Sequence, residues 1–247
     1  DFQKREINKT IGILFDDAES SLSKYLNRKE NGIWKRELDT VMDWTLINCQ
    51  PNMKSGFAAA AFRSPEGETV IAFRGTEPTE LGRLYQDVET DYKIYTGLDH
   101  ELIDQFTDAK EFVCQTLKIE SLDEISKRHR LSFTGHSLGG GLADYLVYLT
   151  KDTTSTTFNA VGFAQCLPKE ELKSILNNPD PYRERIKDYC DAWDIIGNSG
   201  IHIGERIYLI NDQTLDAPYF VATTNSATNP WEYFNNYFET YFRNLWD

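Results

Sequence analysis

The stretch Phe133-Thr134-Gly135-His136-Ser137-Leu138-Gly139-Gly140-Gly141-Leu142-Ala143 decides the fold of this chain. It contains Gly-x-Ser-x-Gly, a pattern in which the glycines permit a sharp turn from a strand into a helix and lift the serine clear of its neighbours. Apolar residues precede the pattern, and the glycines after it let a helix start close to a sheet. We therefore predict a strand over 130–134, a turn at Ser137 and a buried helix over 137–150.

Strand-like and helix-like segments alternate on both sides of this turn. Residues 64–67, Ser-Pro-Glu-Gly, are a turn signal between two strand-like runs and predict a hairpin. Residues 153–157 are rich in Ser and Thr, and their short length predicts a loop. The alternation predicts an α/β fold with helices on the faces of a sheet. The expected strands are 56–63, 68–73, 130–134, 158–163, 185–190 and 206–210, and the expected helices are 1–27 (one helix or a pair), 100–117 and 137–150.

Length and composition restrict the class of protein. A chain of 247 residues is long enough for one sizeable core, so we expect a single domain over 1–247. No apolar run approaches the roughly 20 residues that span a bilayer, which predicts a soluble protein, cytoplasmic or secreted without a visible signal peptide. The net charge of −13 disfavours nucleic acid as a partner. The oligomeric state is left open.

The four cysteines, Cys49, Cys114, Cys166 and Cys190, are widely spaced. They form no Cys-x-x-Cys pair and have none of the Cys/His spacing of a zinc site, so we expect no metal. Free cysteine behaves as a small buried hydrophobe. This favours free thiols in the core over disulfides.

The serine of the turn indicates nucleophilic catalysis. A serine hydroxyl needs a base to take its proton, an acid to orient the base, and hydrogen-bond donors for the developing oxyanion. The N–H of Leu138 follows the serine at a helix N-terminus and is one such donor by position. A second donor must come from an earlier strand, and the strand-like run 69–73 ends in Arg74-Gly75-Thr76.

Taken together, these segments resemble the class 3 (fungal-type) lipases and their bacterial lipase-like relatives, within the α/β-hydrolase superfamily. Val70-Ile71-Ala72-Phe73-Arg74-Gly75-Thr76 looks like the family's strand and oxyanion loop, and 133–143 is similar to its nucleophile elbow. Thr157-Phe158-Asn159-Ala160 resembles the strand after the elbow, and Asp194-Ile195-Ile196-Gly197 resembles the segment of the triad acid. The resemblance implies a central, mostly parallel sheet with helices on both faces.

The resemblance also implies a function and its residues. It implies an esterase or lipase that cleaves carboxylic esters, in particular triacylglycerol or phospholipid esters, through an acyl-enzyme on Ser137. Asp194, ahead of Asp191, is the implied acid, and Thr76 with Leu138 forms the implied oxyanion hole. The expected partners are the ester substrate and, transiently, a lipid interface, and the chemistry requires no cofactor. Arg74 is expected to brace the oxyanion loop through an ion pair, and Asp87 and Asp91 resemble acidic positions after that loop.

The general base is the part of the family pattern that does not carry over. The family's base lies well downstream of its acid, and no histidine follows His202. His202 itself lies in a segment that resembles a family strand whose histidine is not the base. His136 lies inside the elbow, where the family also tolerates a structural histidine, and His100 and His129 precede the nucleophile in poorly placed segments. Three explanations remain open: the sequence is truncated before the base, His202 has taken the role, or catalysis is lost. The last would make the chain a lipase-like binding or interaction module.

The C-terminal segment is crowded with aromatic residues at helical spacing. We expect a helix packed on the core, with a lid or a surface that contacts acyl chains or membranes as the alternative. These residues are Trp231, Tyr233, Phe234, Tyr237, Phe238, Tyr241, Phe242 and Trp246.

Overall fold

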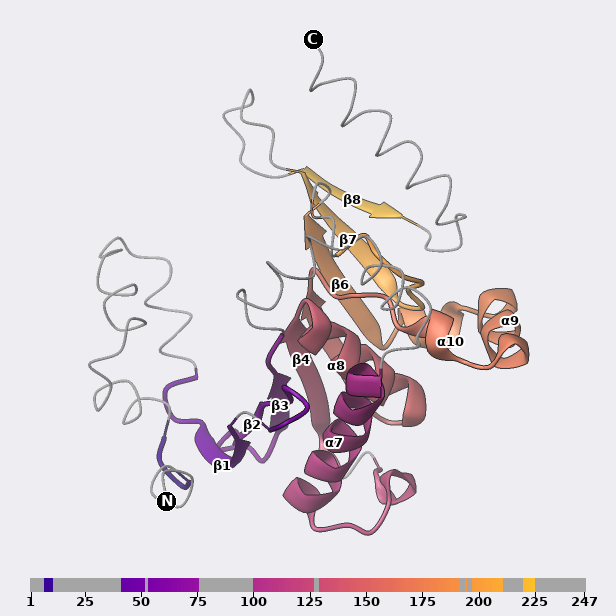
Figure 1. Cartoon of the computed structure of the whole chain (residues 1–247). Helices are drawn as coiled ribbons and strands as arrows, with labels where there is room; N and C mark the ends of the chain where they lie inside the picture. The colour runs from indigo at the N-terminus through magenta and orange to yellow at the C-terminus, as the bar shows by residue number, and fades with distance from the viewer. Residues whose placement is uncertain are drawn as a thin grey trace.

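The computed structural model of the chain describes residues 7–10, 41–51, 53–75, 100–126, 129–191, 194, 197–210 and 220–224. These residues contain one sheet of eight strands, which lie side by side in the order of the sequence (Figure 1). The strands from β3 to β7 are parallel, and an antiparallel pair, β1 and β2, and the single antiparallel strand β8 extend the two edges. The strands are β1 Thr45–Gln50, β2 Ala59–Arg63, β3 Thr69–Phe73, β4 Leu131–His136, β5 Thr154–Phe158, β6 Ile186–Asp191, β7 Glu205–Ile210 and β8 Phe220–Thr224.

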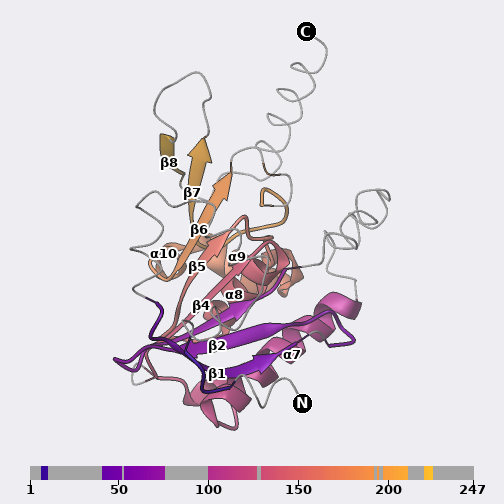
Figure 2. The ribbon, with the colours of Figure 1, turned by 90° about the vertical axis from the view of Figure 1, so that its left-hand side faces the viewer.

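The described helices lie in the connections between the parallel strands. Helix α7 joins β3 to β4, helix α8 joins β4 to β5, and α9 and α10 lie between β5 and β6. Crossovers between parallel strands are right-handed, and here each new strand is added on the same side of the last. All of these helices therefore fall on one face of the sheet, behind the strands in Figure 2. Their bounds are α7 His100–Leu117, α8 Leu138–Leu149, α9 Lys169–Asn177 and α10 Asp180–Arg183, with short 3₁₀ helices at Leu122–Glu124 and Ala164–Cys166.

The core lies between this face of the sheet and helices α7 and α8. Alternate residues of β3 and β4 are buried, as expected for strands covered on one face. After Leu138, helix α8 has three buried glycines and then mostly apolar buried residues, so it lies directly on the sheet. The most deeply buried core side chains include Phe57, Ile71, Phe133, Val113, Leu142, Leu146, Val147 and Ile186.

The opposite face of the sheet carries the other residue of each alternation. In the part of the chain that the structure describes, no helix covers this face. Phe158 at the end of β5 is 47% exposed, and its ring stacks on that of Tyr189 in β6 at 6.0 Å between ring centres. The mostly parallel α/β fold predicted from the sequence is confirmed.

One strand was predicted in the wrong place. The strand after the elbow is 154–158 rather than 158–163, so the Ser/Thr-rich segment expected to be a loop is strand β5. Thr is β-branched and favours strands. The hydroxyl groups of Ser155 and Thr157 point into the core, where they donate hydrogen bonds to the carboxylates of Asp144 and Asp188. Strand β5 lacks the buried apolar residues by which strands are predicted, because its buried positions are Ser155 and Thr157.

The other expected elements can be checked in part. The hairpin of β2 and β3, the helix over 100–117 and the later strands are confirmed. The N-terminal helix, the aromatic segment 231–246 and Asp87 with Asp91 lie outside the described residues. None of the four cysteines is in a disulfide, as predicted, but only Cys190 is buried and Cys166 is exposed. Among the described residues, no helix is both long enough and apolar enough to cross a membrane.

Candidate active site

Ser137 occupies the turn between β4 and α8 in a strained conformation. Its φ of 56° and ψ of −128° are costly for a residue with a side chain, and such strain persists only where the surroundings impose it. Three main-chain hydrogen bonds do so. The Ser137 N–H donates to the carbonyl of Phe158 at 3.1 Å, and the Ser137 carbonyl accepts from the N–H groups of Gly141 and Val161, each at 3.2 Å. The sequence prediction of a nucleophile elbow agrees with this geometry.

The end of β3 lies directly against this elbow. A Cβ added to Gly139 would lie 2.3 Å from the carbonyl oxygen of Phe73, so only glycine permits the contact. A Cβ on Gly75 would lie 2.7 Å from the carbonyl oxygen of His136 and 3.3 Å from the Cβ of Ser137. Gly75, two residues after the end of β3, therefore lies next to Ser137. Thr76, the predicted oxyanion donor, is the next residue in the chain but lies outside the described residues.

Leu138 is the first residue of α8. The first N–H groups of a helix have no partner within the helix, and the helix dipole adds partial positive charge at that end. The position of the Leu138 N–H at this helix end is suited to an oxyanion, and its role stays a prediction. Arg74, expected in an ion pair, donates from Nη2 to the carbonyl of Gly56 at 3.3 Å.

Asp194 lies between β6 and β7, and we call the described residues of this connection, 194 and 197–204, the acid loop. Its Oδ1 accepts from the N–H of Gly197 at 2.6 Å, and its Oδ2 accepts from Nδ2 of Asn159 at 3.3 Å. The Asp194 carbonyl accepts from the N–H and the Nδ2 of Asn198 at 3.1 and 2.7 Å. Each oxygen of the Asp194 carboxylate therefore accepts a hydrogen bond, one from Gly197 and one from Asn159. Asp191, the second choice from the sequence, is the last residue of β6.

Asn159 is a residue of this site whose polar contacts the sequence did not indicate. It follows β5 in the left-handed conformation, with φ of 45°, which Asn tolerates better than most residues. Its N–H donates to the Tyr189 carbonyl at 2.9 Å, and its Oδ1 accepts from the N–H of Asp191 at 2.7 Å. Because its Nδ2 also reaches Asp194, this one side chain joins the end of β5 to the acid loop.

His202 lies in the acid loop, and its ring is already engaged. Its Nε2 is 3.1 Å from the carbonyl oxygen of Ser199, which can only accept, so Nε2 carries a proton. Burial, followed by the positive charge of Arg206, lowers the pKa of His202 well below its usual value. The ring is therefore neutral at pH 7. Of the other histidines, His136 is exposed, and His129 accepts at Nδ1 from the N–H of Ser126 at 3.1 Å.

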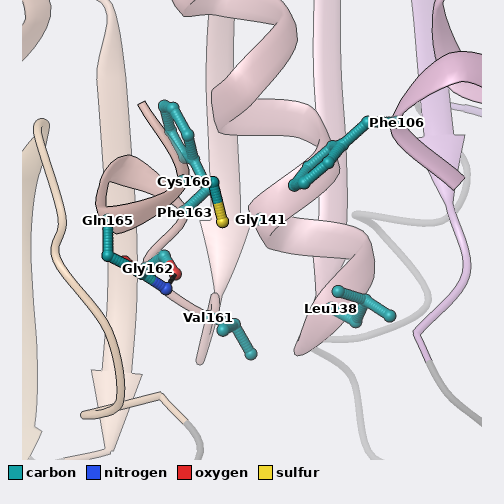
Figure 3. Close-up of a pocket in the computed structure, with 8 residues that line it drawn as sticks. All are labelled: Phe106, Leu138, Gly141, Val161, Gly162, Phe163, Gln165 and Cys166. Carbon is teal, nitrogen blue, oxygen red and sulfur yellow. Dashed lines mark hydrogen bonds between the residues drawn. The ribbon is translucent and has the colours of Figure 1, made fainter. Parts of the chain in front are cut away.

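A small apolar hollow adjoins the elbow (Figure 3). Leu138, Gly141 and Val161, which form part of its wall, are the residues that follow Ser137 or donate hydrogen bonds to its carbonyl. Phe106 contributes a ring from α7, opposite Phe163 and Cys166 (Figure 3). The full lining is Phe106, Leu138, Gly141, Val161, Gly162, Phe163, Gln165 and Cys166.

Comparison with known proteins identifies the family. The model of the Tle-like phospholipase domain matches residues 29–225, most of the chain. The chain belongs to this phospholipase-like family. A search of curated protein sequences finds no match.

Solved structures resemble the Tle-like chain in fold. The triacylglyceride lipase of Rhizomucor miehei is 17% identical, with a TM-score of 0.52 over 78% of this chain and 75% of the lipase. A lipase from Rhizopus microsporus var. chinensis is 15% identical, with a TM-score of 0.43 over 87% of this chain and 77% of that chain. The first likeness shows the α/β-hydrolase fold. The lipase-like family predicted from the sequence is confirmed, and the Tle-like chain belongs among ester-hydrolysing lipase-like proteins.

Proposed function

We propose that this chain is a serine esterase that cleaves the carboxylic esters of lipids, with phospholipids as the preferred class. The observation that carries the proposal is the strained conformation of Ser137 at the start of α8, with the end of β3 packed against it. This arrangement would be costly to keep in a protein that only bound a ligand. The preference for phospholipids rests on the Tle-like phospholipase family.

In the proposed reaction, Ser137 Oγ attacks the ester carbonyl carbon while a base removes its proton. The oxyanion that forms accepts from the Leu138 N–H and from Thr76. The tetrahedral intermediate then collapses, the bond to the alcohol oxygen breaks, and the base returns the proton to that alcohol. Water, activated by the same base, releases the acid and regenerates Ser137. Asp194 orients the base, and the small apolar hollow adjoins the serine.

We propose that the base is a histidine other than His202, in keeping with the downstream position that the lipase resemblance implies. A triad base donates one ring N–H to the acid, whereas His202 donates from Nε2 to the Ser199 carbonyl. No histidine follows His202 in residues 203–247, so the parent for these assays is the chain together with any natural sequence beyond Asp247. In that parent, His202→Asn should retain ester hydrolysis within a few-fold. Loss of hydrolysis in a folded His202→Asn protein would instead make His202 the base.

The function is tested with a short-chain chromogenic ester and with phosphatidylcholine and triacylglycerol emulsions. The parent should hydrolyse the short-chain ester and release fatty acid from phosphatidylcholine faster than from triacylglycerol. It should also be labelled by a fluorophosphonate, and Ser137→Ala should lose both hydrolysis and labelling. A folded parent that shows neither would favour the alternative of a lipase-like binding module.

A further inference from the structure

Beneath α8 lies a cluster of buried polar side chains that the proposed reaction does not use. They come from α8 and from three neighbouring strands, β5, β6 and β7. Charged groups are costly to bury unless they are paired and hydrogen-bonded, so a cluster of this kind requires an explanation. Its members are Asp144, Ser155, Thr157, Asp188 and Arg206.

Arg206 and Asp188 form the ionic centre of this cluster. They are direct partners in the register of β6 and β7, and only 7% of Arg206 and 1% of Asp188 is exposed. Arg206 Nε lies 3.4 Å from Asp188 Oδ2, an ion pair without the geometry of a hydrogen bond. Asp188 Oδ1 accepts from the N–H of Ala160 at 3.1 Å and from Thr157 Oγ1 at 3.3 Å. The carboxylate therefore anchors one side of the guanidinium.

The other side of the guanidinium reaches the acid loop. Arg206 Nη2 donates to the carbonyl of Gly197 at 2.5 Å, and the N–H of the same glycine donates to Asp194 Oδ1 at 2.6 Å. Gly197 is also closely packed, because an added Cβ would lie 2.8 Å from Cys190 Sγ and 2.9 Å from the Cα of Asn159. A displacement of Gly197 would therefore be passed directly to the Asp194 carboxylate.

We propose that Arg206 is a positioning residue, which fixes Gly197 and through it the orientation of the Asp194 carboxylate, with Asp188 as its buried counter-ion. The inference rests on the proposed function in that Asp194 is taken as the acid of the triad. Arginine suits this role because its planar guanidinium presents several N–H groups in a fixed fork. One edge can face a carboxylate while another donates to a carbonyl. A lysine keeps the positive charge, but its compact ammonium group cannot face the carboxylate and the carbonyl in the same fixed geometry.

Arg206→Lys tests the proposal, and Arg185→Lys is its matched control. Arg185 also donates to main-chain carbonyls, those of Val147 at 2.9 Å and Thr150 at 2.7 Å. These lie at the far end of α8, about 15 to 20 Å along the helix from Ser137 at roughly 1.5 Å per residue. Both variants lose hydrogen bonds from a buried or partly buried guanidinium to main-chain carbonyls, so both are expected to have a lower melting temperature. Only Arg206→Lys disturbs Asp194.

On a soluble chromogenic ester, Arg206→Lys should lower kcat by roughly 10- to 100-fold with KM within about twofold, because a small misplacement of a catalytic group affects the chemical step. Arg185→Lys should leave kcat unchanged below its melting temperature. An unchanged kcat in Arg206→Lys, or an equal loss in both variants, would overturn the proposal. If Arg206→Lys does not fold, Asp188→Asn replaces it and should change kcat in the same direction.

A second measurement does not depend on turnover. With ¹⁵N-labelled glycine, the Gly197 amide is identified as the glycine resonance that moves most in Asp194→Asn. The short hydrogen bond of the Gly197 N–H should place the chemical shift of this amide proton downfield. Arg206→Lys should move that chemical shift upfield, and Arg185→Lys should leave it unchanged. A parent without Ser137-dependent hydrolysis would contradict the proposed function alone. A Gly197 resonance unmoved by Arg206→Lys would contradict the positioning role.

Discussion

The two halves of the candidate site are held in place by different means. Ser137 is fixed by main-chain hydrogen bonds and by glycines that let β3, β4 and α8 approach closely. Asp194 is fixed by the side chains of Asn159 and Asn198 and, through Gly197, by Arg206. The difference teaches that the nucleophile is held by main-chain groups and close backbone packing, whereas the acid depends on the side chains of Asn159, Asn198 and Arg206. Substitutions in the two halves should therefore fail in different ways.

The largest expected effect is the loss of the nucleophile. Ser137→Ala should lower kcat for a short-chain ester by about a millionfold, the scale seen when a triad serine is removed. Because the turn is held by main-chain groups, the melting temperature should stay within a few degrees of the parent. Steady-state kinetics and calorimetry measure the two quantities. Residual hydrolysis near the parental rate would mean that another residue attacks the ester.

The next largest effect is expected at the acid. Asp194→Asn should lower kcat by about 10⁴-fold, since an amide cannot hold the base in the required tautomer. The control is Asp191→Asn, which alters the neighbouring carboxylate at the end of β6. The same kinetic assay compares them. If Asp191→Asn has the larger effect, the assignment of the acid moves to Asp191.

Close packing of the elbow predicts an effect on stability. Gly139→Ala should lower the free energy of unfolding by about 3 kcal/mol or more, because the new methyl group would overlap the Phe73 carbonyl. Gly67→Ala is the matched control, since it also changes glycine to alanine but meets no atom within 4 Å. Its φ of 86° should cost only about 1 kcal/mol. Denaturant unfolding compares the two, and equal losses would argue against the close approach of β3.

The smallest expected effect depends on pH and concerns the cluster beneath α8. Burial, followed by the charge of Asp188, raises the pKa of Asp144 well above its usual value. The folded state then keeps a proton that the unfolded chain releases near pH 4, so stability falls as the pH rises above that point. Asp144→Asn should stabilise the protein by about 1 kcal/mol at pH 7. The gain should vanish below about pH 4.

Thermal melts between pH 3 and pH 8 test this prediction, with Asp152→Asn as an exposed control. Asp152 lies at the surface just before β5, so Asp152→Asn replaces a carboxylate outside the buried cluster. If Asp144→Asn stabilised the protein equally at every pH, the stabilisation could not be explained by the proton that Asp144 keeps in the folded state.

Those parts of the molecule that rest on local pattern could be predicted from the sequence. The elbow, the hairpin and helices α7 and α8 follow from glycines, turn residues and apolar periodicity. Strand β5 was misplaced because its buried face is made of hydroxyl groups, whose partners Asp144 and Asp188 lie 11 and 31 residues from them. Asp194 was assigned by family resemblance. Its links to Asn159 and Arg206 join residues on different strands, and no local pattern indicates such pairs.

Residues 158–161, at the end of β5 and just after it, contact both Ser137 and Asp194 and so determine the spacing between them. The carbonyl of Phe158 and the N–H of Val161 hold Ser137, while Asn159 between them holds Asp194. These four consecutive residues thus contact both the serine and the acid, so the spacing between Ser137 and Asp194 depends on them rather than on the rest of the 56 residues between the two. Helices α9 and α10, which lie within that stretch, could change in length without altering the spacing, whereas one residue added between Phe158 and Val161 would change it at once.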